Sequence, residues 1–62
     1  MYTVVFESGK RVMFSKADYL LSFLLRKCPK MQLRTFALII DWINDDTDLF
    51  PFHWIPFYIT KE

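Results

Sequence analysis

Apolar and polar residues alternate at the start of the chain, which is the pattern of β-strands with one buried face. Two β-rich runs, residues 2–6 and 10–14, flank Glu7-Ser8-Gly9 and predict a β-hairpin. A two-residue turn would scatter the apolar side chains over both faces, whereas a three-residue turn with a left-handed Gly9 gathers them on one. The three-residue turn, which we expect, pairs Phe6 with Lys10, Val4 with Val12 and Tyr2 with Phe14.

The next segment has the spacing of an amphipathic helix. Ser15 and Asp18 fit a capping box, in which the serine oxygen accepts a backbone N–H and the carboxylate reaches back to the cap, so we expect Ser15 to cap the helix. Pro29 disfavours helical geometry at the residue before it, so the helix should end near Lys27. One face carries the apolar residues Ala17, Leu20, Leu21, Leu24, Leu25 and Cys28.

A second helix is expected from about Pro29 to Asn44 after a very short connection, because proline is favoured in the first turn of a helix. Its apolar residues lie nearly all round it. One face carries Leu33, Phe36, Ala37, Ile40 and Ile43, and another carries Met31, Leu38, Ile39 and Trp42. Such a helix should be buried on several sides, which a hairpin and one neighbouring helix can scarcely provide.

Residues 49–60 form an aromatic segment that contains Pro51 and Pro56. The prolines exclude a helix, and they exclude a central strand because proline lacks the N–H that a β-ladder needs. Residues 57–60 can pair with the first strand as an edge. The expected fold is therefore α+β in the order ββααβ, with a two-helix hairpin packed on the β-hairpin, and residues 1–62 are expected to form a single compact domain.

The composition indicates more apolar surface than so short a chain can readily hide. Hydrophobic residues make up 53% of the 62 and aromatic residues 19%, while a chain of this length buries only about 60% of the surface that its unfolded form exposes. The surplus serves either a rich core or contact with a partner protein or a second copy. The candidate partner-binding residues, about half of them expected inside the domain, are Trp42, Phe50, Phe52, Trp54, Phe57 and Tyr58.

The charges divide the chain in two. Residues 1–40 carry seven bases and two acids, a net of +5, and residues 41–62 carry one base and five acids, a net of −4, which together give +1. The expected fold gathers a basic pole of Lys10, Arg11, Arg26, Lys27, Lys30 and Arg34 and an acidic pole of Asp41, Asp45, Asp46 and Asp48. The second helix then has cations at its start and anions at its end, opposite to what its dipole favours. Solubility, or pairing of the acids with Lys16, explains this pattern as well as a functional charged pole does.

Residue types suited to catalysis or metal binding are sparse. Cys28 and His53 are far apart with no local signature, and residues 41–48 lack the spacing and central glycine of a calcium loop. Gly9 is the sole glycine, which excludes a glycine-rich phosphate loop. We therefore expect no enzymatic activity, metal or cofactor. The single cysteine, with no secretory signal and no apolar run of about 18 residues, indicates a cytoplasmic protein without a membrane span.

The stretch YTVVFESGKRVMFSKADYLLSFLL, residues 2–25, resembles the hairpin-then-helix start of short accessory proteins of bacteriophages. The resemblance implies a stoichiometric inhibitor or modulator of a host or defence protein, of the anti-defence type. Our leading hypothesis is a non-enzymatic protein-binding module, acting alone or as a homo-oligomer. The alternative is a small nucleic-acid-binding regulator that uses the basic pole, although we expect its aromatic residues to lie in the acidic half, apart from the cations.

Overall fold

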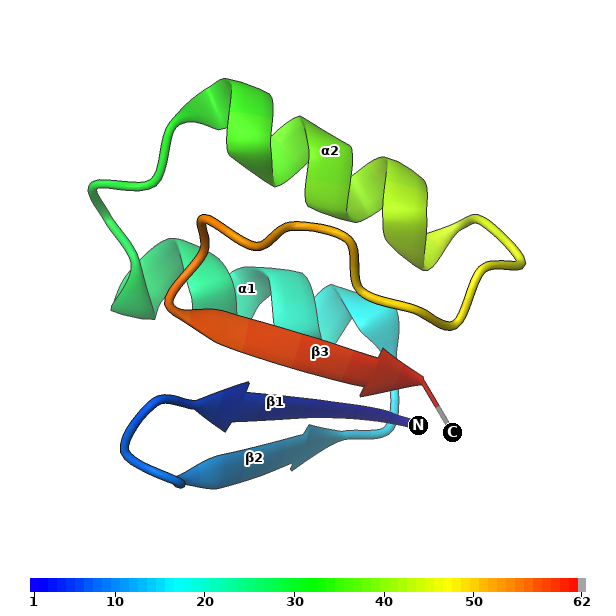
Figure 1. Ribbon diagram of the computed structural model, residues 1–62, viewed down its shortest axis with the longest axis horizontal. Helices are drawn as coiled ribbons and strands as arrows, with labels where there is room; N and C mark the ends of the chain where they lie inside the picture. The colour runs from blue at the N-terminus through cyan, green and yellow to red at the C-terminus, as the bar shows by residue number, and fades with distance from the viewer. Residues whose placement is uncertain (62) are drawn as a thin grey trace.

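A computed structural model describes residues 1–61 and has the α+β architecture expected from the sequence (Figure 1). The elements are β1 (Tyr2–Phe6), β2 (Arg11–Phe14), α1 (Ala17–Lys27), α2 (Leu33–Ile43) and β3 (Phe57–Lys61). The strands form one antiparallel sheet in the order β2-β1-β3. The ββααβ prediction is confirmed, including the final edge strand paired with the first strand.

The β1–β2 hairpin has the predicted three-residue turn. Gly9 has φ +90°, a conformation that side chains with a Cβ rarely adopt, and its N–H donates to the Phe6 carbonyl over 2.9 Å. The Phe6 N–H donates in turn to the Lys10 carbonyl, and Val4 stands opposite Val12 in the ladder. This register places Tyr2, Val4, Phe6, Val12 and Phe14 on the face toward the helices, as the alternation predicts.

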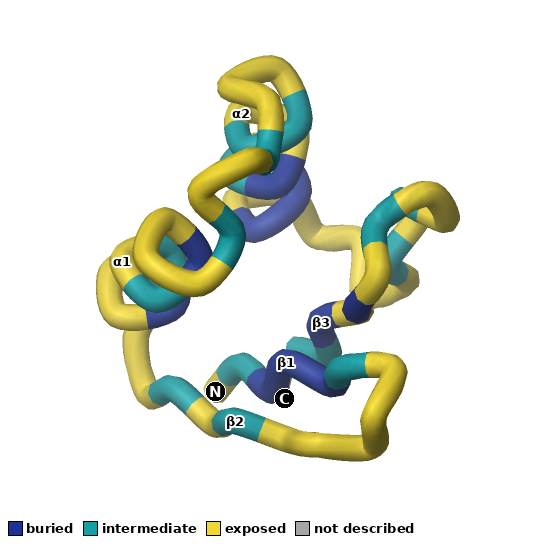
Figure 2. Tube along the Cα trace, turned by 90° about the vertical axis from the view of Figure 1, so that its left-hand side faces the viewer, coloured by how far each residue is buried: buried dark blue, intermediate teal, exposed yellow. Residues whose placement is uncertain are grey.

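Three walls enclose the core above the sheet. Both helices lie on one side of the sheet, and the segment 49–56, which we call the tail, spans from α2 to the β3 edge on the side away from α1 (Figure 2). The core residues are Val4, Leu20, Leu24, Ile39, Trp42, Ile43, Phe57 and Ile59. Every element except β2 contributes to this cluster, so the fold depends on the tail bringing β3 back beside β1.

Helix α1 begins one residue later than the capping pattern predicts. Lys16 occupies the cap position with extended backbone, φ −135° and ψ 147°, and no side chain caps the helix. Ser15 therefore lies outside the cap position, and the prediction that its hydroxyl caps the helix was wrong. Asp18 still stands in the first turn, where the helix dipole favours an anion. The helix ends at Lys27, as the following proline predicts.

The connection between the helices is longer than expected, because α2 begins at Leu33 rather than at Pro29. The Met31 N–H donates to the Cys28 carbonyl over 3.0 Å, which closes a β-turn with Pro29 at its second position. Proline favours that turn position as strongly as it favours the first turn of a helix. The prediction of a very short connection was therefore wrong, because Pro29 lies in a β-turn, a position that proline also favours, and not in the first turn of α2.

Helix α2 is buried on one side only, although its sequence is apolar nearly all round. Ile39, Trp42 and Ile43 lie in the core, whereas Leu33 is 82% exposed and Leu38 also faces solvent. The expectation of burial on several sides was wrong, since the sheet, α1 and the tail all meet the same face of α2. Part of the surplus apolar surface is therefore the outer face of this helix.

The end of α2 is held by Lys61, the last residue of β3, which lies at the same end of the molecule (Figure 1). The Lys61 ammonium donates hydrogen bonds to the carbonyls of Trp42, Asp45 and Thr47 at 2.5, 2.8 and 2.9 Å. It also stands 4.2 Å from the centroid of the Trp42 ring, in cation–π contact. The Trp42 indole N–H donates to the Leu49 carbonyl over 2.8 Å. One cation thus joins the last turn of α2 to the loop that follows it, and it adds a donor at a helix end, where the carbonyls lack the full set of intrahelical partners.

We predict that Lys61→Met lowers the free energy of unfolding by about 2 kcal/mol, because methionine keeps the aliphatic stem but donates no hydrogen bond to the three carbonyls. Urea denaturation followed by circular dichroism measures the change. Lys16→Met is the matched control, since Lys16 is exposed, and its effect should stay within about 0.5 kcal/mol. Equal effects of the two substitutions would contradict the capping role of Lys61.

Candidate binding surface around Trp54

A ladder of aromatic rings leads from the core to the surface. Trp42 meets Phe50 edge to face at 5.1 Å between centroids, Phe50 meets Phe52 at 5.1 Å, and Phe52 meets Trp54 at 5.6 Å. Edge-to-face pairs add about 0.5–1.5 kcal/mol beyond the area they bury. The first ring is 5% exposed and the last is 65% exposed. The ladder therefore supports an exposed indole from the core outward.

Trp54 stands at the tip of a turn in the tail. The Ile55 N–H donates to the Phe52 carbonyl over 3.4 Å, which closes the turn, and Pro56 follows just before β3. The tail starts beside the end of α2, at the right of Figure 1, and runs back to the left before β3 returns. The tip of the turn therefore lies near the α1–α2 connection rather than near the loop that follows α2.

The six aromatic residues proposed from the sequence have three different positions. Trp42 and Phe57 are buried in the core, Phe50 and Phe52 are half-buried rungs of the ladder, and Trp54 and Tyr58 are exposed. About half were expected inside the domain, and the two most exposed are Trp54 at 65% and Tyr58 at 48%, a tryptophan and a tyrosine as binding hot spots favour. We therefore concentrate on Trp54 and Tyr58 as contact residues, with the others as their support.

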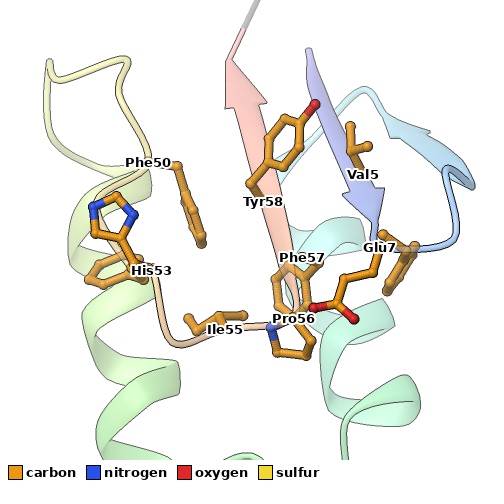
Figure 3. Close-up of a pocket in the computed structure, with 10 residues that line it drawn as sticks. Val5, Glu7, Phe50, His53, Ile55, Pro56, Phe57 and Tyr58 are labelled. Atoms are coloured by element: carbon orange, nitrogen blue, oxygen red, sulfur yellow. The ribbon is translucent and has the colours of Figure 1, made fainter.

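A hollow of about 400 Å³ opens between the tail and the sheet (Figure 3). Phe50 and His53 stand on its tail side, and Val5 and Tyr58 stand on its sheet side, above Ile55 and Pro56. The Glu7 carboxylate lies at its edge beside Pro56. This tail hollow is apolar within, and Glu7 gives its edge a negative charge.

A larger cleft of about 640 Å³ opens on the other side of the same turn, between the α1–α2 connection and the end of the tail. We call it the connection cleft. Its walls are Lys27, Cys28, Pro29, Lys30, Met31, Gln32 and Thr35 from the helices and Trp54, Ile55, Pro56 and Phe57 from the tail. The last three residues of that set also line the tail hollow, so they form the wall between the two concave surfaces.

The connection cleft changes where the aromatic residues stand relative to the charges. Trp54 was expected in the acidic half of the molecule, but it lines one cleft with Lys27 and Lys30. That expectation was wrong because the tail crosses the molecule after α2 instead of remaining at the end where it starts. The aromatic turn and two members of the basic pole thus share one surface.

The remaining charges follow the ends of the elements. The hairpin turn, the end of α1 and the start of α2 lie toward one end of the molecule in Figure 1, and the loop after α2 lies at the other. The first end carries the proposed basic residues Lys10, Arg11, Arg26 and Arg34. The second end carries the proposed acidic residues Asp41, Asp45, Asp46 and Asp48. The Asp45 carboxylate accepts the Asp46 N–H over 2.8 Å. Lys61 also lies at this acidic end, where its ammonium donates to the backbone carbonyls of the α2 end and the loop after it.

The outer face of the sheet has no helix on it (Figure 2). Thr3 and Val5 are buried there between neighbouring strands, while Met13 is 60% exposed and Tyr58 is 48% exposed. These side chains surround a shallow hollow of about 420 Å³ that also includes Arg11. Because Tyr58 borders both this hollow and the tail hollow, it connects the outer sheet face to the surface around Trp54.

Comparison with protein-family models, with curated proteins and with solved structures finds no match for this chain. Within residues 1–61, no helix has the length and apolar character needed to cross a membrane. The same residues bring no three histidine, cysteine, aspartate or glutamate side chains together as a metal site requires. The proposed function therefore rests on the shape, exposure and charge of the surface.

Sequence reasoning missed Lys61 as the cation at the end of α2, and it missed Met31, Ile55 and Pro56 as lining residues of one cleft. A signal for Lys61 existed, since it is the only base in residues 41–62 and terminates the strand expected beside the first one. No comparable signal links residue 31 to residue 55. Their proximity follows from the path of the tail, which no periodicity encodes.

Cys28, the only cysteine, lines the connection cleft as a free thiol. Burial raises the pKa of this thiol above its ordinary value. We predict that alkylation by iodoacetamide has its pH midpoint at a higher pH in the folded protein than in the same protein unfolded in urea. Because the folded state keeps its proton longer, the thiol's contribution to stability is present below the unfolded pKa and declines as the pH rises through the folded pKa. Equal midpoints would contradict the prediction.

Proposed function

We propose that the protein is a non-enzymatic protein-binding module that inhibits or modulates a host or defence protein stoichiometrically, in the cytoplasm. The observation that carries the proposal is the 65% exposure of Trp54 at the tip of the tail turn, where it ends a ladder of rings and lines the connection cleft. An isolated exposed apolar residue needs no explanation. An exposed indole that a ring contact supports at the side of a cleft has the features of an interface anchor.

The energetics of Trp54 favour a contact role over a structural one. A tryptophan side chain buries up to about 250 Å² in a core or an interface, so covering its exposed part on a partner contributes on the order of 3 kcal/mol. The edge-to-face contact with Phe52 already orders the ring in the free protein. Little rotamer freedom then remains to be lost on binding, which increases the share of that energy available for affinity.

The charges beside Trp54 favour an acidic partner surface. Lys27 and Lys30 line the adjoining cleft. Arg26 at the end of α1 and Arg34 at the start of α2 are close to them in the chain. Cations around an apolar anchor accelerate association with an acidic surface and disfavour basic partners. The resemblance of residues 2–25 to phage accessory proteins supports a host or defence protein as that partner, and it supplies no contact residue.

We predict that Trp54→Ala weakens binding to the partner at least about tenfold, as loss of an interface anchor does. The wild-type protein is immobilised, and a lysate of the cells in which it occurs is passed over it in parallel with the variant. Proteins held by the wild type and lost by Trp54→Ala are then measured by titration with purified material. Leu33→Ala is the matched control, because Leu33 is an exposed apolar residue on the outer face of α2.

The two variants separate a binding surface from general apolar stickiness. Circular dichroism and urea denaturation first establish that Trp54→Ala remains folded, as its exposure leads us to expect. A partner lost equally by Trp54→Ala and Leu33→Ala would count against the tail turn as the site. Light scattering on the pure chain tests a second copy as the occupant, since a dimer that dissociates in Trp54→Ala makes the protein its own partner.

Nucleic-acid binding is the second candidate, and one observation favours it more than the sequence did. Trp54 and the cations Lys27 and Lys30 line one cleft, so an aromatic ring and phosphate-binding groups are side by side. Binding to a generic single-stranded DNA that weakens steeply with salt and is lost in Lys27→Gln with Lys30→Gln would replace our proposal. If no such DNA binding is found at low salt, the proposal of a protein partner stands and nucleic-acid binding is excluded.

A further inference from the structure

We infer that the connection cleft binds a small amphipathic carboxylate: an aromatic or branched apolar group that ends in COO⁻. This ligand site goes beyond the protein-binding proposal, although both involve Trp54. The cleft has a volume of about 640 Å³, within the roughly 300–1,000 Å³ typical of small-molecule sites. It is large enough for a bicyclic ring and is bounded by two separate segments of the chain.

The interior of the cleft is suited to an apolar group. Phe57 is buried at its base, and Met31, Ile55 and Cys28 are half-buried around it. Burial raises the pKa of the Cys28 thiol, so that this side chain is neutral at pH 7. Trp54 forms one rim, with an indole face on which a flat ring can stack. An apolar ligand that enters here covers surface that water contacts in the free protein.

The charged groups of the cleft select an anion. Lys27 and Lys30 both line it, and its other polar residues, Gln32 and Thr35, are neutral. No carboxylate belongs to this lining, as far as residues 1–61 describe it. The first turn of α2 borders the cleft and contains no acid that would neutralise the lysines. A carboxylate at the rim is therefore attracted, and an ammonium group there is repelled.

The tail hollow provides an internal comparison. It shares Ile55, Pro56 and Phe57 with the connection cleft, but its charged lining residue is Glu7. An amphipathic anion should therefore avoid the tail hollow and occupy the connection cleft. The two concave surfaces share an apolar wall and differ in the sign of their charge, so charge is the property that the experiment must vary.

Three probes keep one ring system and one methylene and change the charge of the polar group from −1 to 0 to +1: 1-naphthylacetate, 1-naphthylacetamide and 1-naphthylmethylammonium. Their binding is followed by the indole N–H signals of the 15N-labelled protein. Trp54 lines the cleft, whereas Trp42 is buried and its indole N–H donates to Leu49, so it serves as an internal reference. We expect 1-naphthylacetate to shift the Trp54 signal saturably and to leave that of Trp42 unchanged. The amide should bind more weakly, and the ammonium most weakly.

Paired substitutions test the role of the lysines. Lys27→Gln with Lys30→Gln should weaken 1-naphthylacetate about threefold to tenfold, the range for one or two exposed charge pairs, and leave the amide unchanged. Lys10→Gln with Arg11→Gln is the matched control, since it removes two cations from the hairpin instead of the cleft. A second readout is protection: bound 1-naphthylacetate should slow alkylation of Cys28.

Three results would overturn the inference: equal affinity for the three probes, equal loss in both double variants, or absence of a saturable shift at Trp54. A fourth result would also contradict it: a shift of residues that line the tail hollow and not the cleft, such as Val5 and Glu7, would place the ligand in the tail hollow. None of these results bears on the protein-binding proposal, which rests on loss of a macromolecular partner in Trp54→Ala and does not involve the naphthyl probes.

Discussion

The contact between Lys61 and the end of α2 joins the last strand of the sheet to the helix that precedes it in the chain. Lys61 is the last described residue of β3, and its ammonium binds the Trp42, Asp45 and Thr47 carbonyls while it faces the Trp42 ring. A helix end attracts cations, yet α2 carries no base in its last turn. The reversed charge order of α2 in the sequence is thus offset by a cation that the tertiary structure supplies.

The path of the tail follows from this contact. Because β3 pairs with β1 and its end contacts the end of α2, the tail must run from the end of α2 to the other end of the molecule, where β3 begins and runs back (Figure 1). Trp42 starts the ring ladder on the same side, so the indole that Lys61 faces is also the support of Phe50. The exposed Trp54 and the two hollows beside it are therefore consequences of how the C-terminal strand is attached.

Local patterns predicted what local interactions decide. The hairpin register follows from Gly9 and the alternation around it, and the apolar stripe predicted α1 apart from its first residue. Pro29 was misassigned because a β-turn and a helix start use the same residue at equivalent positions. The position of Trp54 relative to Lys30 was mispredicted for a different reason: contacts made by a returning segment depend on the whole chain path, which sequence distance does not describe.

The exposed apolar residues of this small domain fall into two groups that differ in their support. Leu33 and Met13 stand out from a helix face and a sheet face, and their exposure follows from a chain whose core has only one side to fill. Trp54 is different, because a turn and an edge-to-face contact hold it at the side of a cleft that Lys27 and Lys30 also line. Preorganised apolar groups bind with little loss of freedom, whereas mobile ones do not. The surplus apolar surface expected from composition is thus spread over the molecule, and the part around Trp54 is held by a ring contact beside a cleft that two lysines line.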